Sequence, residues 1–212
     1  MPWKCFVAED SGLYRRSFRR YCGGSECKTN PLGCHNVEVV VDPELPGAFG
    51  PSRGDIPDDE VKKDPRWPRE CLCGYRFHPM EDSWQVNVDS LYKGAPDGKL
   101  HLIKELPPGA MWDAHWFVDT KEGMERYGGP DGKGWCLMTP ARVEWIVYSP
   151  SSDGNKWQVT GTIPKITVSP SIGINIRGGL AHPTKSYHGF LRDGILSEDV
   201  DGRKFEGVPR TA

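Results

Sequence analysis

Glycine and proline are the residues that most restrict what this chain can fold into. The 212 residues include 25 glycines and 19 prolines, spread along the whole length. In the interior of a helix, glycine costs about 1 kcal/mol relative to alanine and proline costs about 3 kcal/mol. Long helices do not survive at this density of breakers, which excludes an all-helical bundle. The sequence therefore favours short strands joined by turns.

The charge balance narrows the class of partner. The 27 Lys and Arg residues against 29 Asp and Glu residues give a net charge of −2. General nucleic-acid binders derive their affinity from neutralising phosphates, so a nearly neutral chain is not expected to bind nucleic acid. The one basic stretch, Arg15 to Arg20, is expected to be a solvated face. Eight Trp, seven Tyr and seven Phe residues supply enough large side chains for a core.

The chain lacks the signals of membrane insertion and secretion. No apolar run approaches the roughly 20 residues that a bilayer-spanning helix needs. The N-terminal sequence MPWKCFVAEDSGLYRR has no apolar stretch of the kind found in signal peptides. We therefore expect a cytoplasmic protein with no membrane partner, in which the seven cysteines are thiols or metal ligands rather than disulfides.

Alternation of apolar and polar residues predicts strands, mostly in the C-terminal two thirds. The predicted strands are residues 37–41, 85–88, 135–138, 143–148, 156–160, 163–168, 171–176, 187–191 and 195–196, with a turn at 192–194 between the last two. One helix is predicted to begin near Pro107-Pro108 and to continue through Phe117, since proline suits the first helical turn.

The predicted fold class is mainly β (α+β): an antiparallel sheet domain with one or two short helices and an N-terminal, zinc-stapled, Pro-rich segment. We expect that segment to span residues 1–80 and the β-rich domain to span residues 81–212.

Cysteine and histidine pairs lie on both sides of a proline-rich excursion at residues 42–70, which contains six prolines. Zinc prefers four nitrogen or sulfur ligands in a tetrahedron, commonly supplied as two short pairs. Gly74, directly after the second pair, suits a tight knuckle. The preferred ligand set is Cys27, His35, Cys71 and Cys73, with Cys22 or Cys34 as substitutes. The alternative is that these cysteines are small buried apolar residues. A zinc ion with four protein ligands would be structural, because no position is left for water.

A serine and a histidine form a second candidate constellation. Ser171 lies in the segment Thr167 to Ile172, and His188 lies in the following strand. Serine becomes a nucleophile when a base lies within hydrogen-bond reach, and histidine is the usual base near neutral pH. Adjacent β elements could place Ser171 and His188 on one face, with Asp113 as the group that orients the histidine. Asp153 and Asp193 compete for that role, and an ordinary β-turn with a strand histidine gives the same pattern.

The C-terminal third resembles the BubE-type domain family. The matching residues are Trp157, Gly161, Pro164, Thr167, Ser169-Pro170-Ser171-Ile172 and His188 through Gly194. Longer family members, found in phages of actinobacteria, are also similar in the upstream segments Asp64 to Pro68, Cys71 to Tyr75 and Leu106 to Ala114. The chain departs from the family pattern in two places. Tyr187 stands where Cys is frequent, and Ser197 to Gly202 replaces an Asp-Cys-Thr-His segment.

The resemblance implies a phage-encoded, serine-peptidase-like hydrolase that acts near the C-terminus of a ubiquitin-like protein or on another protein substrate. Ser171 would then be the nucleophile and His188 the general base. The rival hypothesis is a non-enzymatic phage structural or host-interaction protein that uses the same fold as a binding module. A weaker alternative is a zinc-dependent hydrolase using His115, His182 or His188, although no H-E-x-x-H pairing supports it.

Overall fold

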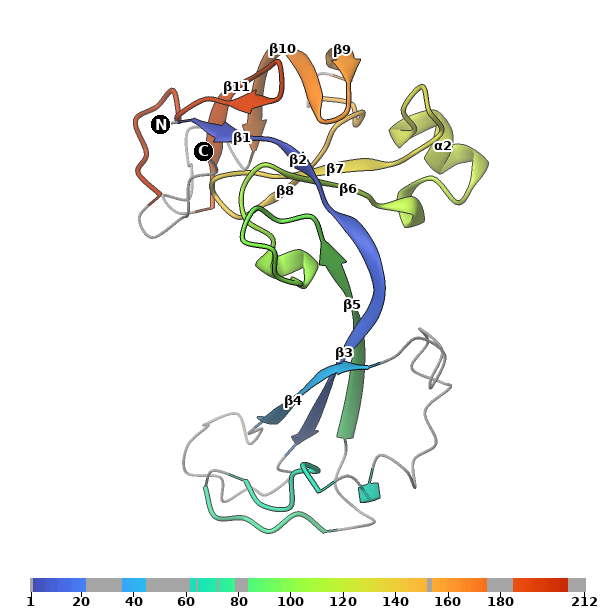
Figure 1. Cartoon of the computed structure of the whole chain (residues 1–212), viewed down its shortest axis with the longest axis vertical. Coiled ribbons are helices and arrows are strands. Elements are labelled where there is room, and N and C mark those ends of the chain that lie inside the picture. Colours follow the sequence, from blue (N-terminus) through green and yellow to red (C-terminus); the bar gives the residue numbers. More distant parts are fainter. Residues whose placement is uncertain are drawn as a thin grey trace. The chain divides into compact units, whose positions relative to one another are not determined.

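The computed structural model describes residues 2–21, 36–44, 62–63, 65–71, 73–78, 84–151, 154–174 and 185–205. It separates into two compact units, one formed by Met1–Glu9 with Tyr92–Ala212 and the other by Asp10–Leu91. The architecture is mainly β with antiparallel sheets, as the sequence predicts (Figure 1). The unit boundaries differ from the expected division at residue 80, because the first two strands pair with strands of the C-terminal part.

A five-stranded antiparallel sheet forms one layer of the first unit. Its strands are β1 (Trp3–Lys4), β9 (Gln158–Thr162), β10 (Lys165–Ile174), β11 (Tyr187–Arg192) and β12 (Ile195–Leu196), in the order β1-β12-β11-β10-β9. The two regions predicted as separate strands, 163–168 and 171–176, are one continuous strand through Pro170. Alternate residues of β10 and β11 point into the core, so the other face of both strands is left to solvent.

The turn between β11 and β12 confirms a prediction made from local sequence. Asp193 and Gly194 have φ values of 46° and 71°, and positive φ at both central positions is the requirement of a type I′ hairpin turn. Gly194 also donates its N–H to the carbonyl oxygen of Ile166 at 2.9 Å and accepts from the N–H of Cys5 at 2.7 Å. The turn therefore connects β12 to both β10 and the N-terminal strand.

A four-stranded sheet lies in the same unit. It contains β2 (Phe6–Val7), β6 (Ala110–Asp113), β7 (Trp135–Met138) and β8 (Glu144–Ile146) in that order, with β2 and β6 parallel and the other pairs antiparallel. Two short 3-10 helices, η2 (Ile103–Glu105) and η3 (His115–Phe117), and the helix α2 (Lys121–Tyr127) accompany it. Thr120 caps α2, because its hydroxyl accepts a hydrogen bond from the N–H of Gly123 at 3.0 Å.

The prediction of a helix from Pro107 to Phe117 is wrong. Residues 110–113 form β6, and only the last three residues are helical, as η3. Met111 and Trp112 are both 0% exposed, so consecutive side chains are buried on opposite faces of the strand. Burial on both faces produces a continuous apolar run, which a buried helix can also produce.

The core of the first unit is rich in aromatic side chains, as the composition indicates. Its main cluster joins both sheets and consists of Trp3, Cys5, Met111, Trp135, Leu137, Ala141, Trp145, Val147, Ile166, Val168, Ile172, Ile174, Tyr187, Leu191 and Leu196. Ile172 of β10 and Tyr187 of β11 are both 0% exposed, so each of these two strands is anchored in the core through its inner face.

A three-stranded antiparallel sheet contains β3 (Glu9–Tyr21), β4 (Asn36–Glu44) and β5 (Trp84–Lys93), in the order β4-β3-β5. Arg20 on β3 is only 4% exposed, which corrects the expectation that the arginine-rich stretch is entirely a solvated face. Its guanidinium donates to the carbonyl oxygens of Pro68 and His78 at 3.0 and 2.9 Å. The same group lies against the rings of Trp67 and Phe77, which stabilises it by cation–π contact.

Within the described part of the chain, no helix combines the length and the apolar character needed to cross a membrane.

Candidate functional site

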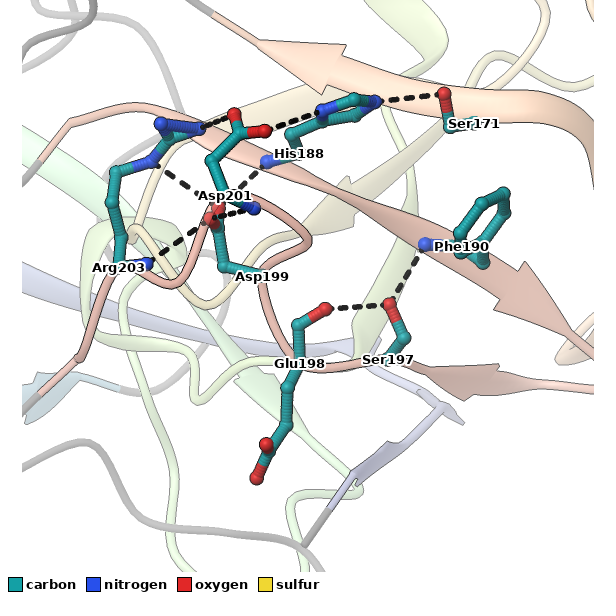
Figure 2. Close-up of polar contacts among 8 residues, drawn as sticks. All are labelled: Ser171, His188, Phe190, Ser197, Glu198, Asp199, Asp201 and Arg203. Atoms are coloured by element: carbon teal, nitrogen blue, oxygen red, sulfur yellow. Dashed lines mark hydrogen bonds and ion pairs between the residues drawn. The ribbon is translucent and has the colours of Figure 1, made fainter.

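Ser171 and His188 meet on neighbouring strands of the five-stranded sheet. Ser171 is on β10 and His188 is on β11, and the serine Oγ lies 2.9 Å from the histidine Nε2 (Figure 2). The histidine side chain is 32% exposed and the serine is half-buried, so both reach the solvent side of the sheet. The structure thus brings together the two residues that the sequence paired.

An irregularity in β10 places Ser171 at this position. Val168 pairs with Leu191 and Ile172 pairs with Gly189, so four steps along β10 correspond to two steps along β11. Between these two pairs β10 has two residues more than β11. Because the excess is an even number, Val168 and Ile172 stay on the same, buried face. Ser171 lies within this bulged segment, and bulges commonly redirect a side chain beside a functional site.

The second ring nitrogen of His188 faces Asp201. His188 Nδ1 lies 3.3 Å from Asp201 Oδ1, in the loop that follows β12. Asp113, the carboxylate favoured from sequence, lies at the end of β6, and its Oδ1 accepts the N–H of Gly134 at 3.3 Å. Asp193 occupies the hairpin turn, and Asp153 lies outside the described residues. The structure therefore brings Asp201, rather than Asp113, to the histidine.

Asp199 organises the loop that presents Asp201. Its side chain is 0% exposed, and it accepts the backbone N–H of His188 at 2.8 Å through Oδ2. Its Oδ1 accepts the backbone N–H groups of Asp201 and Arg203 at 2.9 and 3.2 Å. The N–H of Val200 donates in turn to the carbonyl oxygen of His188 at 2.7 Å. The loop is therefore fixed to the backbone of the same residue whose ring it contacts.

Arg203 bridges the two carboxylates. Its Nη2 donates to Asp201 Oδ2 at 2.7 Å, and its Nε lies 3.2 Å from Asp199 Oδ2 (Figure 2). The arginine side chain is only 15% exposed. Sequence reasoning missed Asp199, Asp201 and Arg203. The signal that could have found the loop is Asp-Val-Asp-Gly two residues after the return strand, because aspartate side chains accept backbone N–H groups two residues onward.

The residues named as zinc ligands are described only in part. Cys71 is 3% exposed and packs against Phe77, and Cys73 is half-buried. Gly74 has a φ of 88° and donates its N–H to the carbonyl oxygen of Cys71 at 2.9 Å, which closes the tight turn expected of a knuckle.

The other half of the zinc prediction lies outside the described residues, because Cys27, His35 and the substitutes Cys22 and Cys34 all fall in 22–35. Among the residues that the structure does describe, no three His, Cys, Asp or Glu side chains gather as a metal site. The zinc site stays a prediction from sequence.

Comparison of the chain with protein-family models, with curated proteins and with solved structures finds no match.

Proposed function

We propose that this protein is a serine hydrolase of the peptidase type, in which Ser171 is the nucleophile, His188 the general base and Asp201 the group that orients the histidine. The observation that supports the proposal is the continuous series of contacts from Ser171 Oγ to His188 Nε2, at 2.9 Å, and from His188 Nδ1 to Asp201 Oδ1, at 3.3 Å. Serine, histidine and aspartate act as a catalytic triad when they are arranged in this order, whatever the fold.

Each member of the triad has a distinct chemical role. A neutral imidazole donates from one nitrogen and accepts at the other. Asp201 beside Nδ1 favours the tautomer with the proton on Nδ1, which leaves the Nε2 lone pair to accept the Ser171 hydroxyl proton. The carboxylate also stabilises the imidazolium that forms when this proton is transferred.

The reaction would proceed in two halves. Ser171 Oγ attacks the carbonyl carbon of the scissile bond while its proton moves to His188 Nε2, and the leaving amine or alcohol departs with that proton. Water then gives its proton to His188 and attacks the acyl-serine ester, which releases the carboxylic acid and returns the proton to Ser171. The net reaction consumes one water molecule for each scissile bond that is hydrolysed.

The substrate class follows from the resemblance together with the exposure of the site. Ser171 and His188 lie on the outer face of a sheet, with the histidine side chain 32% exposed. An open position of this kind suits a protein segment, and the BubE resemblance favours the C-terminal region of a ubiquitin-like protein. By the same resemblance, we propose that the protein is phage-encoded and acts in the host cytoplasm.

Labelling with a fluorophosphonate probe tests the proposal. The wild-type protein should form one covalent adduct, and Ser171→Ala should form none while its melting temperature changes little. Ser169→Ala is the matched control, because Ser169 is exposed on the same strand and should leave labelling intact. Equal labelling of the wild type and Ser171→Ala would overturn the proposal and favour the binding-module rival.

Two carboxylate variants separate the residue found by structure from the residue favoured by sequence. Asp201→Asn should lower the rate of labelling by about 10²- to 10⁴-fold, because an amide favours the wrong tautomer. Asp113→Asn should leave the rate unchanged, since the Asp113 carboxylate accepts the backbone N–H of Gly134. The reverse result would restore Asp113 as the orienting group.

A further inference from the structure

The loop after β12 contains two aspartates with different environments. Asp201 contacts the histidine ring and its side chain is 43% exposed, whereas the Asp199 side chain is 0% exposed and contacts the backbone of His188. Arg203 contacts both carboxylates. We propose that Asp199 and Arg203 are positioning residues, which hold Asp201 at His188 Nδ1 without touching the substrate. This inference rests on the proposed function, because it concerns the same site.

The contacts of Asp199 make it a geometric link between the loop and β11. Burying a carboxylate is costly unless hydrogen bonds and an opposite charge compensate for the lost water. Asp199 accepts three backbone N–H groups, from His188, Asp201 and Arg203, at 2.8, 2.9 and 3.2 Å. One acceptor group therefore fixes the backbone of the base and the backbone of its orienting residue relative to each other.

Arg203 acts on the side chain of Asp201. An aspartate that is 43% exposed would rotate about its side-chain torsions and bind water in place of the imidazole. The guanidinium is planar, so the ion pair of its Nε with Asp199 Oδ2, at 3.2 Å, limits the directions in which Nη2 can point. Nη2 then holds Asp201 Oδ2 at 2.7 Å, which leaves Oδ1 directed at His188 Nδ1.

The charges of the group support this division of roles. Arg203 lies against two carboxylates, so one negative charge is left over beside the imidazole. Without Arg203, the carboxylates of Asp199 and Asp201 would have no cation between them, and their mutual repulsion would favour movement of Asp201 into solvent. The arginine therefore holds Asp201 in place beside the imidazole.

Kinetics of fluorophosphonate labelling test the inference in the full-length protein. Arg203→Gln should lower the maximal labelling rate about 10- to 100-fold while leaving the probe concentration at half-maximal rate unchanged, because the substrate contacts remain but the base is misplaced. Lys204→Gln is the matched control, since it removes a neighbouring exposed cation and should change neither constant. Arg203→Lys should recover only part of the rate, because an ammonium cannot bridge both carboxylates with a planar fork.

The imidazole proton gives a second measurement that needs no activity. In the wild type, the His188 Nδ1 proton should appear as a strongly downfield NMR resonance that Asp201→Asn abolishes. Arg203→Gln and Asp199→Asn should shift or broaden this resonance, whereas Asp193→Asn, which removes an exposed turn carboxylate, should not.

The outcomes for the site and for the positioning residues are distinguishable. A wild type that is not labelled would remove the hydrolase proposal, and the resonance would then decide the positioning role by itself. A folded Arg203→Gln protein with the wild-type rate and the wild-type resonance would overturn the inference. If Asp199→Asn fails to fold, the two Arg203 variants still decide it.

Discussion

The indole Nε1 of Trp157 donates a hydrogen bond to the backbone carbonyl oxygen of Ser171 at 3.0 Å. Trp157 lies just before β9, which ends its pairing with β10 at the pair Gln158 and Ser169. The indole therefore holds the backbone of β10 where the neighbouring strand no longer does. Its ring also packs edge-on against Trp145, with the ring centres 5.5 Å apart.

Removing this hydrogen bond should affect the site more than the fold. We expect Trp157→Phe to lower the free energy of unfolding by about 1 kcal/mol, the net value of one hydrogen bond. Fluorophosphonate labelling should slow several-fold, because Ser171 loses a fixed position. Trp116→Phe is the control, since Trp116 is 41% exposed and should change neither quantity. Identical labelling by the two variants would contradict the prediction.

Gly194 should tolerate no side chain. A Cβ at this position would lie 2.6 Å from the carbonyl oxygen of Pro164 and 3.1 Å from the Cα of Lys165. Gly98 has nearly the same φ, 70° against 71°, but nothing lies within 4 Å of its Cβ position. Gly98→Ala should cost about 1 kcal/mol for the left-handed backbone alone. Gly194→Ala should cost about 1–3 kcal/mol more in urea denaturation, because the overlap adds to that strain.

Arg20 should stabilise the unit formed by Asp10–Leu91. Arg20→Met keeps the length of the side chain but leaves the carbonyl oxygens of Pro68 and His78 without this donor. We expect a loss of about 1–3 kcal/mol, because the buried carbonyl oxygen of Pro68 loses its charged donor. Hydrogen exchange should quicken in this unit. The exposed Arg69→Met should serve as a control with wild-type exchange.

Two buried thiols should resist alkylation at alkaline pH. Burial raises the pKa of Cys5 and of Cys136 from 9.0 to about 12. The thiolate is the reactive form, so at pH 9 both should react with iodoacetamide far more slowly in the folded protein than in urea. The stability that their burial provides should persist below pH 9 and should fall between pH 9 and 12, as the unfolded chain loses these protons first. Mass spectrometry of the alkylated peptides checks the first statement.

The zinc prediction is tested by metal content. The purified protein should contain about one equivalent of zinc. Cys73→Ser should lower that content and destabilise the unit that contains it. A chelator should destabilise the wild type but not Cys73→Ser. Metal analysis that finds no zinc, together with an unchanged melting temperature in the mutant, would refute the site.

Features encoded by local sequence could be predicted. The hairpin at Asp193 and Gly194 follows from turn chemistry alone, because few residues accept positive φ. The shared face of Ser171 and His188 follows from the alternation of side chains along strands. The two additional residues of β10 relative to β11 do not disturb this alternation, because their number is even.

Features decided by long-range contacts could not be predicted. Met111 and Trp112 belong to a strand because β2 and β7 lie on its two sides, and the apolar run itself does not distinguish this from a helix. Asp201 reaches His188 because Asp199 folds the intervening loop, and the separation of 13 residues between Asp201 and His188 has no periodic signal. Residue type alone does not distinguish Asp113, Asp153 and Asp193 as the carboxylate that orients His188.

The bulge in β10 has a consequence for how the segment can vary in length during evolution. Inserting or deleting one residue between Val168 and Ile172 would turn Ile172 and Ile174 outward and expose two core side chains at once. Gaining or losing two residues would leave the core untouched and would change only what is displayed beside His188. Homologous chains should therefore differ here by pairs of residues, so that the segment carrying Ser171 can diversify while the sheet beneath it is inherited unchanged.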